Sequence, residues 1–154
     1  MHVEISETAP VRVAATAHVG PYDTIGEAFG RVGELAGKAG LFAHPDARMI
    51  AIYHDDPEST PVDQLRSSAA VIVPDGLTIP DGLHELVLPG GRYARTTHVG
   101  PYSGLGQAWA ELMGQWLPQS GHTVRDGDCY ERYLNSAMDT PADQLRTELF
   151  VGLV

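Results

Sequence analysis

The 154-residue chain is poor in cysteine, with Cys129 as its single thiol. One cysteine allows neither an intramolecular disulfide nor a multi-cysteine metal site. Long apolar segments are also lacking, because the longest aliphatic run is about residues 69–73, far short of the ~20 residues that span a bilayer. The start of the chain has no basic segment followed by an apolar one, as a secretory signal would. We therefore expect a cytoplasmic protein without membrane contact.

Basic residues are scarce as well, since 10 Lys and Arg against 20 Asp and Glu give a formal net charge of −10. Contacts that neutralise phosphates supply most nucleic-acid affinity, so direct nucleic-acid binding is disfavoured. Hydrophobic residues make up 43% of the chain, which is ample for one folded domain of this length. Nucleophile elbows, phosphate-binding glycine loops, dinucleotide fingerprints and zinc signatures are missing, so we expect no cofactor and no metal.

The chain contains an internal repeat with an offset of 80 residues. The matched motifs are HVGPY, at His18 and His98, and TPVDQLR or TPADQLR, at Thr60 and Thr140. No gap is needed between these motifs. We interpret the chain as one domain made of two repeats, residues 1–74 and 82–154.

Each repeat shows the same order of expected elements. Apolar residues recur at helical spacing over residues 25–39 in the first repeat and 105–117 in the second, which predicts one amphipathic helix in each. The expected strands cover residues 11–18, 48–54 and 67–74, and residues 83–99, 128–135 and 147–154. The pattern predicts an α+β fold of two β-α-β-β units.

The repeats differ chemically where Ala51 of the first corresponds to Glu131 of the second. Strand alternation places Ala51 beside Tyr53, and Glu131 beside Tyr133, on matching faces. The isoleucines on the other face of the first strand look like partners of its helix, so we expect Glu131 to face a groove on the side away from the helix. Arg132 would then lie on the helix side, which fits a charged residue poorly.

Glu131 could serve two kinds of chemistry in such a groove. Ionised, it would pair with a hydrophobic cation held over aromatic rings. Protonated, it could donate a proton to a substrate and afterwards activate water. The alternative is a structural glutamate, exposed to solvent or paired with an arginine. Glu148 is the second candidate acid, and by alternation it shares a side with Phe150.

Three aromatic residues have two possible roles each. Tyr22 and Tyr102 follow the repeated Gly-Pro turn and either brace the helix start or line the groove. Trp109 lies on the apolar stripe of the second helix, which favours a core position, although its edge could wall a ligand.

Four repeated polar residues are interpreted as structural. His18 and His98 are more simply strand-end hydrogen-bonding residues than metal ligands, because no further ligands cluster beside them. Arg66 and Arg146 are expected to pair with nearby acids or carbonyls.

Four segments, YHDDPESTPVDQLR, LPGGRYARTTHVGPY, CYERYLN and ELFVGL, together resemble the GyrI-like family, also met as the effector-binding domain of AraC-type and multidrug-responsive regulators. The likeness covers nearly the whole chain. It implies a duplicated antiparallel sheet with pseudo-two-fold symmetry, two main helices and a central groove that binds hydrophobic, often cationic, small molecules near a buried glutamate.

By this resemblance, Glu131 in ERYLN and Glu148 in TELFVG match acidic positions of the family, which often has Tyr where this chain has Phe150. Stand-alone members are implicated in sequestering toxic compounds, restraining DNA gyrase and hydrolysing cyclopropane-bearing genotoxic compounds. The sequence favours sequestration of a hydrophobic small molecule, with hydrolysis by Glu131 and Glu148, or DNA gyrase as a protein partner, as the alternatives. The expected ligand-binding residues are Glu131, Tyr133, Tyr53, Ala51, Tyr22, Tyr102, Glu148, Phe150 and Trp109.

Overall fold

The computed structural model describes residues 1–154, which form two compact units. The N-terminal unit is Ala9–Gly90, and the C-terminal unit combines Met1–Thr8 with Gly91–Val154. Strand bounds recur 80 positions apart along the chain, so each strand of one unit has a counterpart in the other. Antiparallel strands and two main helices confirm the predicted α+β class.

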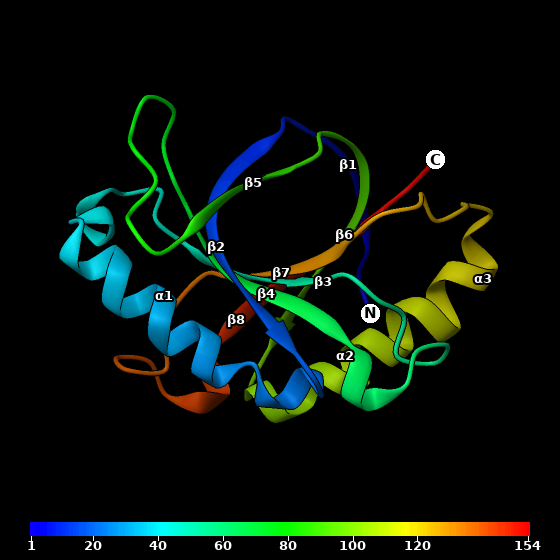
Figure 1. Cartoon of the computed structure of the whole chain (residues 1–154). Coiled ribbons are helices and arrows are strands. Elements are labelled where there is room, and N and C mark those ends of the chain that lie inside the picture. Colours follow the sequence, from blue (N-terminus) through cyan, green and yellow to red (C-terminus); the bar gives the residue numbers. More distant parts are fainter. The chain divides into compact units, whose positions relative to one another are not determined.

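The N-terminal unit is built on four antiparallel strands in the order β5-β2-β4-β3. Its elements are β2 (Val11–Val19), α1 (Gly26–Lys38), β3 (Met49–Tyr53), β4 (Arg66–Ile72) and β5 (His84–Leu88). Helix α1 packs against β2 and β4 (Figure 1). It buries the small side chains of Ala28, Val32 and Ala36. Such residues let a helix approach a sheet closely.

The C-terminal unit repeats this arrangement with the strand order β1-β6-β8-β7. Its strands are β1 (Glu4–Thr8), β6 (Gly91–Val99), β7 (Cys129–Tyr133) and β8 (Arg146–Gly152). Its helix starts as α2 (Leu105–Glu111), passes through a π-helical turn at Leu112–Trp116 and ends as α3 (Leu117–Ser120). Figure 1 shows these segments as one continuous helix, coloured in shades of yellow.

Short 3-10 helices mark the turns of both units. They cover Tyr22–Thr24, Leu41–Ala43, Val62–Gln64, Tyr102–Gly104 and Ala142–Gln144. The repeated TPxDQLR segments supply two of them, and each is followed by a buried leucine, Leu65 or Leu145. These leucines anchor the turn just before β4 or β8 begins.

One face of the C-terminal sheet carries the hydrophobic core under the helix. Leu149 and Val151 of β8 lie on this face and pack in one cluster with Leu105, Ala108 and Leu112. Burying each leucine side chain contributes about 1.5–3 kcal/mol. The residues that alternate with them on β8 therefore point to the opposite face.

That opposite face holds an aromatic cluster of Tyr93, Tyr130 and Phe150. The rings of Tyr130 and Phe150 stack with centroids 4.5 Å apart, and Tyr93 meets Phe150 edge-on at 6.1 Å. Two guanidinium groups cover the cluster, Arg125 at 4.8 Å from the Tyr93 ring and Arg132 at 5.1 Å from the Phe150 ring. Cation–π attraction of this kind helps to hold both guanidinium groups over the rings.

Strand β1 is not predicted from the sequence, although its bounds lie 80 positions before those of β5. Its residues, EISET, are mostly polar, as suits an edge strand, and its partner β6 lies far along the chain. The expected segment 83–99 is in fact two strands, β5 and β6, separated at Pro89 and Gly90. As for the helices, all are too short or too polar to cross a membrane.

Candidate functional site

Glu131 lies on the helix side of the C-terminal sheet, so the expectation that it turns away from the helix is wrong. In the register of β7 and β8, Glu131 pairs with Leu149, which belongs to the helix-facing core. Arg132 pairs with Glu148 and points to the other face. The error arose because both faces of β3 are buried, and Ile50, Ala51 and Ile52 are all at most 1% exposed. Apolar residues there could not identify the helix side.

The Glu131 carboxylate is buried and accepts two short hydrogen bonds. Glu131 is 2% exposed. The indole Nε1–H of Trp109 donates to Oε1 at 2.6 Å, and the hydroxyl of Tyr133 donates to Oε2 at 2.6 Å. Trp109, in the last turn of α2, therefore contributes to the site through its ring nitrogen and also packs against the core. Two donors on one buried carboxylate hold it in a fixed orientation.

Tyr102 extends this group from the 3-10 turn before α2. Its ring meets that of Tyr133 edge-on, with centroids 5.6 Å apart. Partial burial of the Tyr102 phenol raises its pKa, and the negative charge of Glu131 raises this pKa further, although a hydrogen bond to the backbone of Ala137 opposes both.

Thr147 was missed by the sequence reasoning and lies beside this group. It stands directly opposite Tyr133 in the ladder, and its buried hydroxyl has no hydrogen-bond partner. Ser67 occupies the matching place opposite Tyr53 in the N-terminal unit, also without a partner. The repeat offset would have paired the two residues, but burial of a hydroxyl cannot be read from the sequence.

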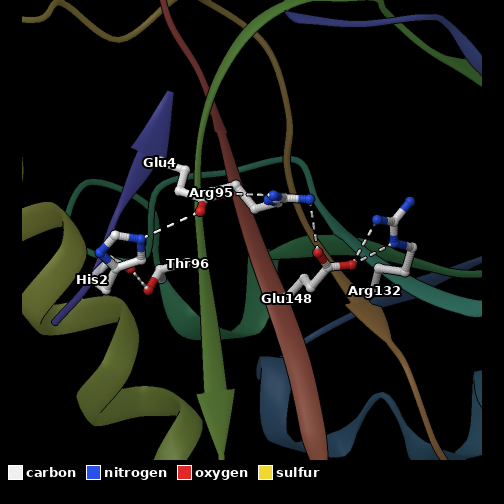
Figure 2. A network of polar contacts seen from close by, with 6 residues as sticks. All are labelled: His2, Glu4, Arg95, Thr96, Arg132 and Glu148. Carbon is white, nitrogen blue, oxygen red and sulfur yellow. Dashed lines mark hydrogen bonds and ion pairs between the residues drawn. The ribbon is translucent and has the colours of Figure 1, made fainter. Parts of the chain in front are cut away.

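Glu148 is the second buried acid, at 5% exposure, and it belongs to a separate network on the opposite face. Arg132 donates from Nε to its Oε1 at 2.8 Å, and Arg95 donates to its Oε2 at 3.3 Å. Arg95 also reaches Glu4 of β1 at 2.6 Å (Figure 2). Glu131 pairs with Leu149, and successive residues of a strand point to opposite faces of the sheet. Glu148 and Phe150, on either side of Leu149 in β8, therefore do not share a face with Glu131.

Several titratable groups near this second network have shifted pKa values. The hydrogen bond from Arg95 lowers the pKa of Glu4, and His2 contributes in the same direction. Burial raises the pKa of the Tyr93 phenol and, more strongly, that of Tyr130. These tyrosines stay neutral and serve as packing surface. The network is best understood as a paired ionic cluster above an aromatic core.

The other predicted site residues, Ala51, Tyr53 and Tyr22, belong to the N-terminal unit. The rings of Tyr22 and Tyr53 lie 4.7 Å apart, and the Tyr22 hydroxyl donates to the Asp55 carbonyl at 2.5 Å. Tyr22 thus braces the turn before α1. Ala51 is fully buried and offers no polar group where its counterpart carries the Glu131 carboxylate.

The repeated histidines and arginines have local partners in most cases. His18 Nε2 lies 2.9 Å from the Thr24 hydroxyl, and His98 Nε2 lies 3.0 Å from the Pro101 carbonyl. Both contacts agree with the expected strand-end hydrogen bonding. Arg66 forms the expected ion pair with Asp55 at 2.8 Å.

Comparison with known proteins places these features in a family. The model of the GyrI-like small molecule binding domain matches residues 1–154. A DNA gyrase inhibitor of Yersinia enterocolitica is 34% identical over 140 residues, which cover 88% of this chain and 87% of the relative. The C-terminal domain of EcmrR has the same fold, with a TM-score of 0.79 and 19% identity over 99% of this chain and 97% of that one.

A further solved structure, SAV2435 bound to tetraphenylphosphonium, matches with a TM-score of 0.72 and 14% identity, covering 100% of this chain and 94% of that one. At these identities the two solved structures show the fold alone. The family model and the Yersinia relative together show that the chain belongs to the GyrI-like family of small-molecule-binding domains.

Proposed function

We propose that the protein binds hydrophobic organic cations at Glu131. The observation that carries this proposal is a buried carboxylate, fixed by Trp109 and Tyr133, with aromatic rings around it. Burying a charge costs free energy unless the charge is paired, because its hydration is lost. A ligand that brings a positive charge would offset this lost hydration of the carboxylate. The aromatic rings of Trp109, Tyr133 and Tyr102 supply apolar contact and cation–π attraction for the rest of such a ligand.

The two hydrogen bonds on Glu131 support binding in a second way. They orient the carboxylate before any ligand arrives, so little ordering remains to be done on association. Binding of tetraphenylphosphonium by SAV2435, a protein of the same fold, agrees with this class of ligand. Sequestration of a toxic or drug-like cation requires only these walls and the counter-charge.

The test is calorimetric titration of the protein with tetraphenylphosphonium. We expect Glu131→Gln, which keeps the shape of the side chain, to weaken binding by about tenfold or more, because a charge-pairing contact is lost. The neutral analogue triphenylphosphine oxide should bind both proteins equally. Glu7→Gln, at an exposed glutamate of β1, is the matched control and should bind like the wild type. Equal affinity of wild type and Glu131→Gln for the cation would refute the charge-pairing proposal.

Hydrolysis is the alternative chemistry for the same carboxylate, with Glu131 as proton donor and then as base for water. A scheme that uses Glu131 and Glu148 together on one substrate is not favoured, because the two carboxylates lie on opposite faces and Glu148 is already paired with two arginines. Mass spectrometry of a cyclopropane-bearing compound after incubation decides the matter. Gain of one water that depends on Glu131 would replace sequestration with hydrolysis.

Restraint of DNA gyrase is a second candidate, because the Yersinia relative is named a DNA gyrase inhibitor. The net charge of −10 would favour a basic surface on such a partner. A gyrase supercoiling assay with rising protein and salt concentrations tests this function. Inhibition that weakens with salt would support it, and unchanged supercoiling at saturating protein would reject it.

A further inference from the structure

The guanidinium of Arg146 lacks the carboxylate that holds its counterpart in the N-terminal unit. Arg66 donates from Nε and Nη2 to the two carboxylate oxygens of Asp55, at 3.0 and 2.8 Å. Asn135 stands where that aspartate would be. Its side-chain oxygen accepts the backbone N–H of Arg146 at 2.9 Å, and its amide nitrogen donates to the Gln144 carbonyl at 3.1 Å. The turn is therefore kept, but the Arg146 guanidinium has no hydrogen-bond or ion-pair partner within the protein.

Arg146 lies on the face of the C-terminal sheet that turns away from the helix. It precedes Glu148 by two residues on β8, and residues two apart on a strand point to the same face. Val99 stands directly opposite Arg146 on β6. On the other side, Leu134 continues the register of β7, and its backbone N–H donates to the Arg146 carbonyl at 3.0 Å. An apolar residue therefore stands on each side of the arginine.

Val99, Leu134 and Arg146 all line a cavity of about 670 Å³. Sites for small organic molecules commonly have volumes of about 300–1,000 Å³. Val99 is 61% exposed, and Arg146 is exposed as well, so both side chains are accessible to a ligand. Glu111 lines the same cavity from α2, beyond the edge of β6 and on the other face of the sheet. Glu131 is not part of the lining, so the cavity is separate from the proposed cation site.

The acids on the face of Arg146 are already paired with other arginines. Glu148 accepts hydrogen bonds from Arg132 at 2.8 Å and from Arg95 at 3.3 Å, and Glu4 contacts Arg95 at 2.6 Å (Figure 2). Two guanidinium groups thus face two carboxylates. Because these charges offset one another, Arg146 is the positive charge in excess in this group.

We propose that this part of the cavity binds a small amphipathic carboxylate, with the carboxylate on the Arg146 guanidinium and an apolar tail against Val99 and Leu134. Hydrogen bonds between a guanidinium and a carboxylate are frequently bidentate and roughly twice as strong as neutral ones. The ligand supplies to Arg146 the kind of group that Asp55 supplies to Arg66. The apolar residues beside the arginine favour a carboxylate with a tail over an inorganic anion.

The experiment is a titration with hexanoate, followed in amide proton–nitrogen correlation spectra. We expect saturable shifts of the Val99 and Leu134 amides, with a Kd of about millimolar. Acetate should bind at least about fivefold more weakly, because it lacks the methylene groups that contact the apolar walls. Hexanol and hexylamine, which have the tail without the negative charge, should also bind more weakly. Only shifts at these two amides are scored, so that binding of hexylamine at Glu131 is not counted.

Asn135→Asp is the most specific variant, because it leaves Arg146 in place and supplies an internal carboxylate that competes with the ligand. The N-terminal unit shows that this turn accepts an aspartate, since Asp55 binds both the backbone N–H and the guanidinium of Arg66. We expect this variant to weaken hexanoate binding by about tenfold or more, as Arg146→Gln should. Asp55→Asn, the matched change in the other unit, should leave it unchanged.

Four results would overturn the proposal. They are the absence of saturable shifts with hexanoate, acetate binding as tightly as hexanoate, hexanol or hexylamine doing so at the same amides, and wild-type affinity for hexanoate in either Asn135→Asp or Arg146→Gln.

Discussion

The two units have matching strand registers but carry chemically different side chains at corresponding positions. On the face of the sheet opposite the helix, the C-terminal unit carries Tyr93, Arg95, Tyr130, Arg132, Glu148 and Phe150. The matched positions of the N-terminal unit carry Val13, Ala15, Ile50, Ile52, Ser68 and Ala70. On the other face, Ala51 and Phe29 correspond to Glu131 and Trp109. Repeated residues therefore build the scaffold, and differing residues place charge and aromatic rings in a single unit.

The difference has a physical cost that the N-terminal unit avoids. Five of the six N-terminal residues are apolar and need no partners, and Ser68 needs only its hydrogen bond with His54. Glu148, in contrast, requires Arg95 and Arg132 to offset its lost hydration. Substitutions at matched positions should reveal this cost, because the same backbone surrounds each pair of residues.

Breaking the ionic cluster should have the largest effect. We expect Glu148→Ala to lower the free energy of unfolding by about 2–4 kcal/mol, because two arginines lose their shared carboxylate in a largely buried setting. Urea denaturation measures the change. Ser68→Ala, at the matched position, loses one hydrogen bond with His54 and should cost about 1 kcal/mol. Equal losses for the two variants would mean that the cluster is no more sensitive than an ordinary polar contact.

Gly152 offers the next test, since Ile72 stands at the matched position. A Cβ atom at Gly152 would lie 2.8 Å from the nearer Nη atom of Arg125, which covers the Tyr93 ring. We expect Gly152→Ala to cost about 1 kcal/mol in unfolding free energy, because the Arg125 guanidinium must shift away from the Tyr93 ring. In a double-mutant cycle with Arg125→Ala, the two losses should not add. Simple additivity would show that the close approach plays no part.

Much of the fold could be predicted from the sequence because the two repeats can be compared, so that an element expected in one repeat is also expected 80 residues away in the other. Helix α1, predicted over 25–39, is found at Gly26–Lys38, and β3, predicted over 48–54, is found at Met49–Tyr53. The same periodicity predicted the second helix but not its π-helical turn, since hydrophobic spacing does not report how the backbone hydrogen bonds are made. Strand β1 could not be predicted in this way, because its pairing depends on a partner far along the chain and not on the local sequence pattern.

The candidate site was predicted in composition but not in orientation. The Ala51-to-Glu131 difference singled out the carboxylate, and Tyr133 beside it on the strand proved to be one of its donors. Which face it occupies was not accessible, because both faces of these strands are buried and apolar pattern alone cannot separate them. Arg132 was the useful warning, since a charge on the supposed core side signalled the wrong face.

Thr147 provides a test with the opposite sign. Its buried hydroxyl has no partner, so Thr147→Val keeps the shape and removes an unpaired polar group. We expect the variant to be more stable by about 1 kcal/mol, measured as a higher urea midpoint. Ser67→Ala in the N-terminal unit should show a smaller gain, because the loss of volume leaves a small void. A destabilised Thr147→Val would indicate that a bound water or ligand uses the hydroxyl.

The smallest expected effect concerns the Asp55–Arg66 pair, whose counterparts are Asn135 and Arg146. Hydrogen bonds from Arg66 hold the pKa of Asp55 below its ordinary value of 3.8. The ionised carboxylate therefore adds stability above pH 3.8, and this contribution is lost as the pH falls through the lower, folded-state pKa.

Asp55→Asn should lower the unfolding midpoint slightly near neutral pH and match the wild type in strong acid, because the asparagine can still accept the backbone N–H of Arg66, as Asn135 does for Arg146. Midpoints measured from about pH 2 to pH 7 test this. A difference that stays constant over this range would show that the charge of Asp55 is not what stabilises the turn. The C-terminal unit, which carries Asn135 at this position, would then lose no stability by lacking the ion pair that Asp55 and Arg66 form in the N-terminal unit.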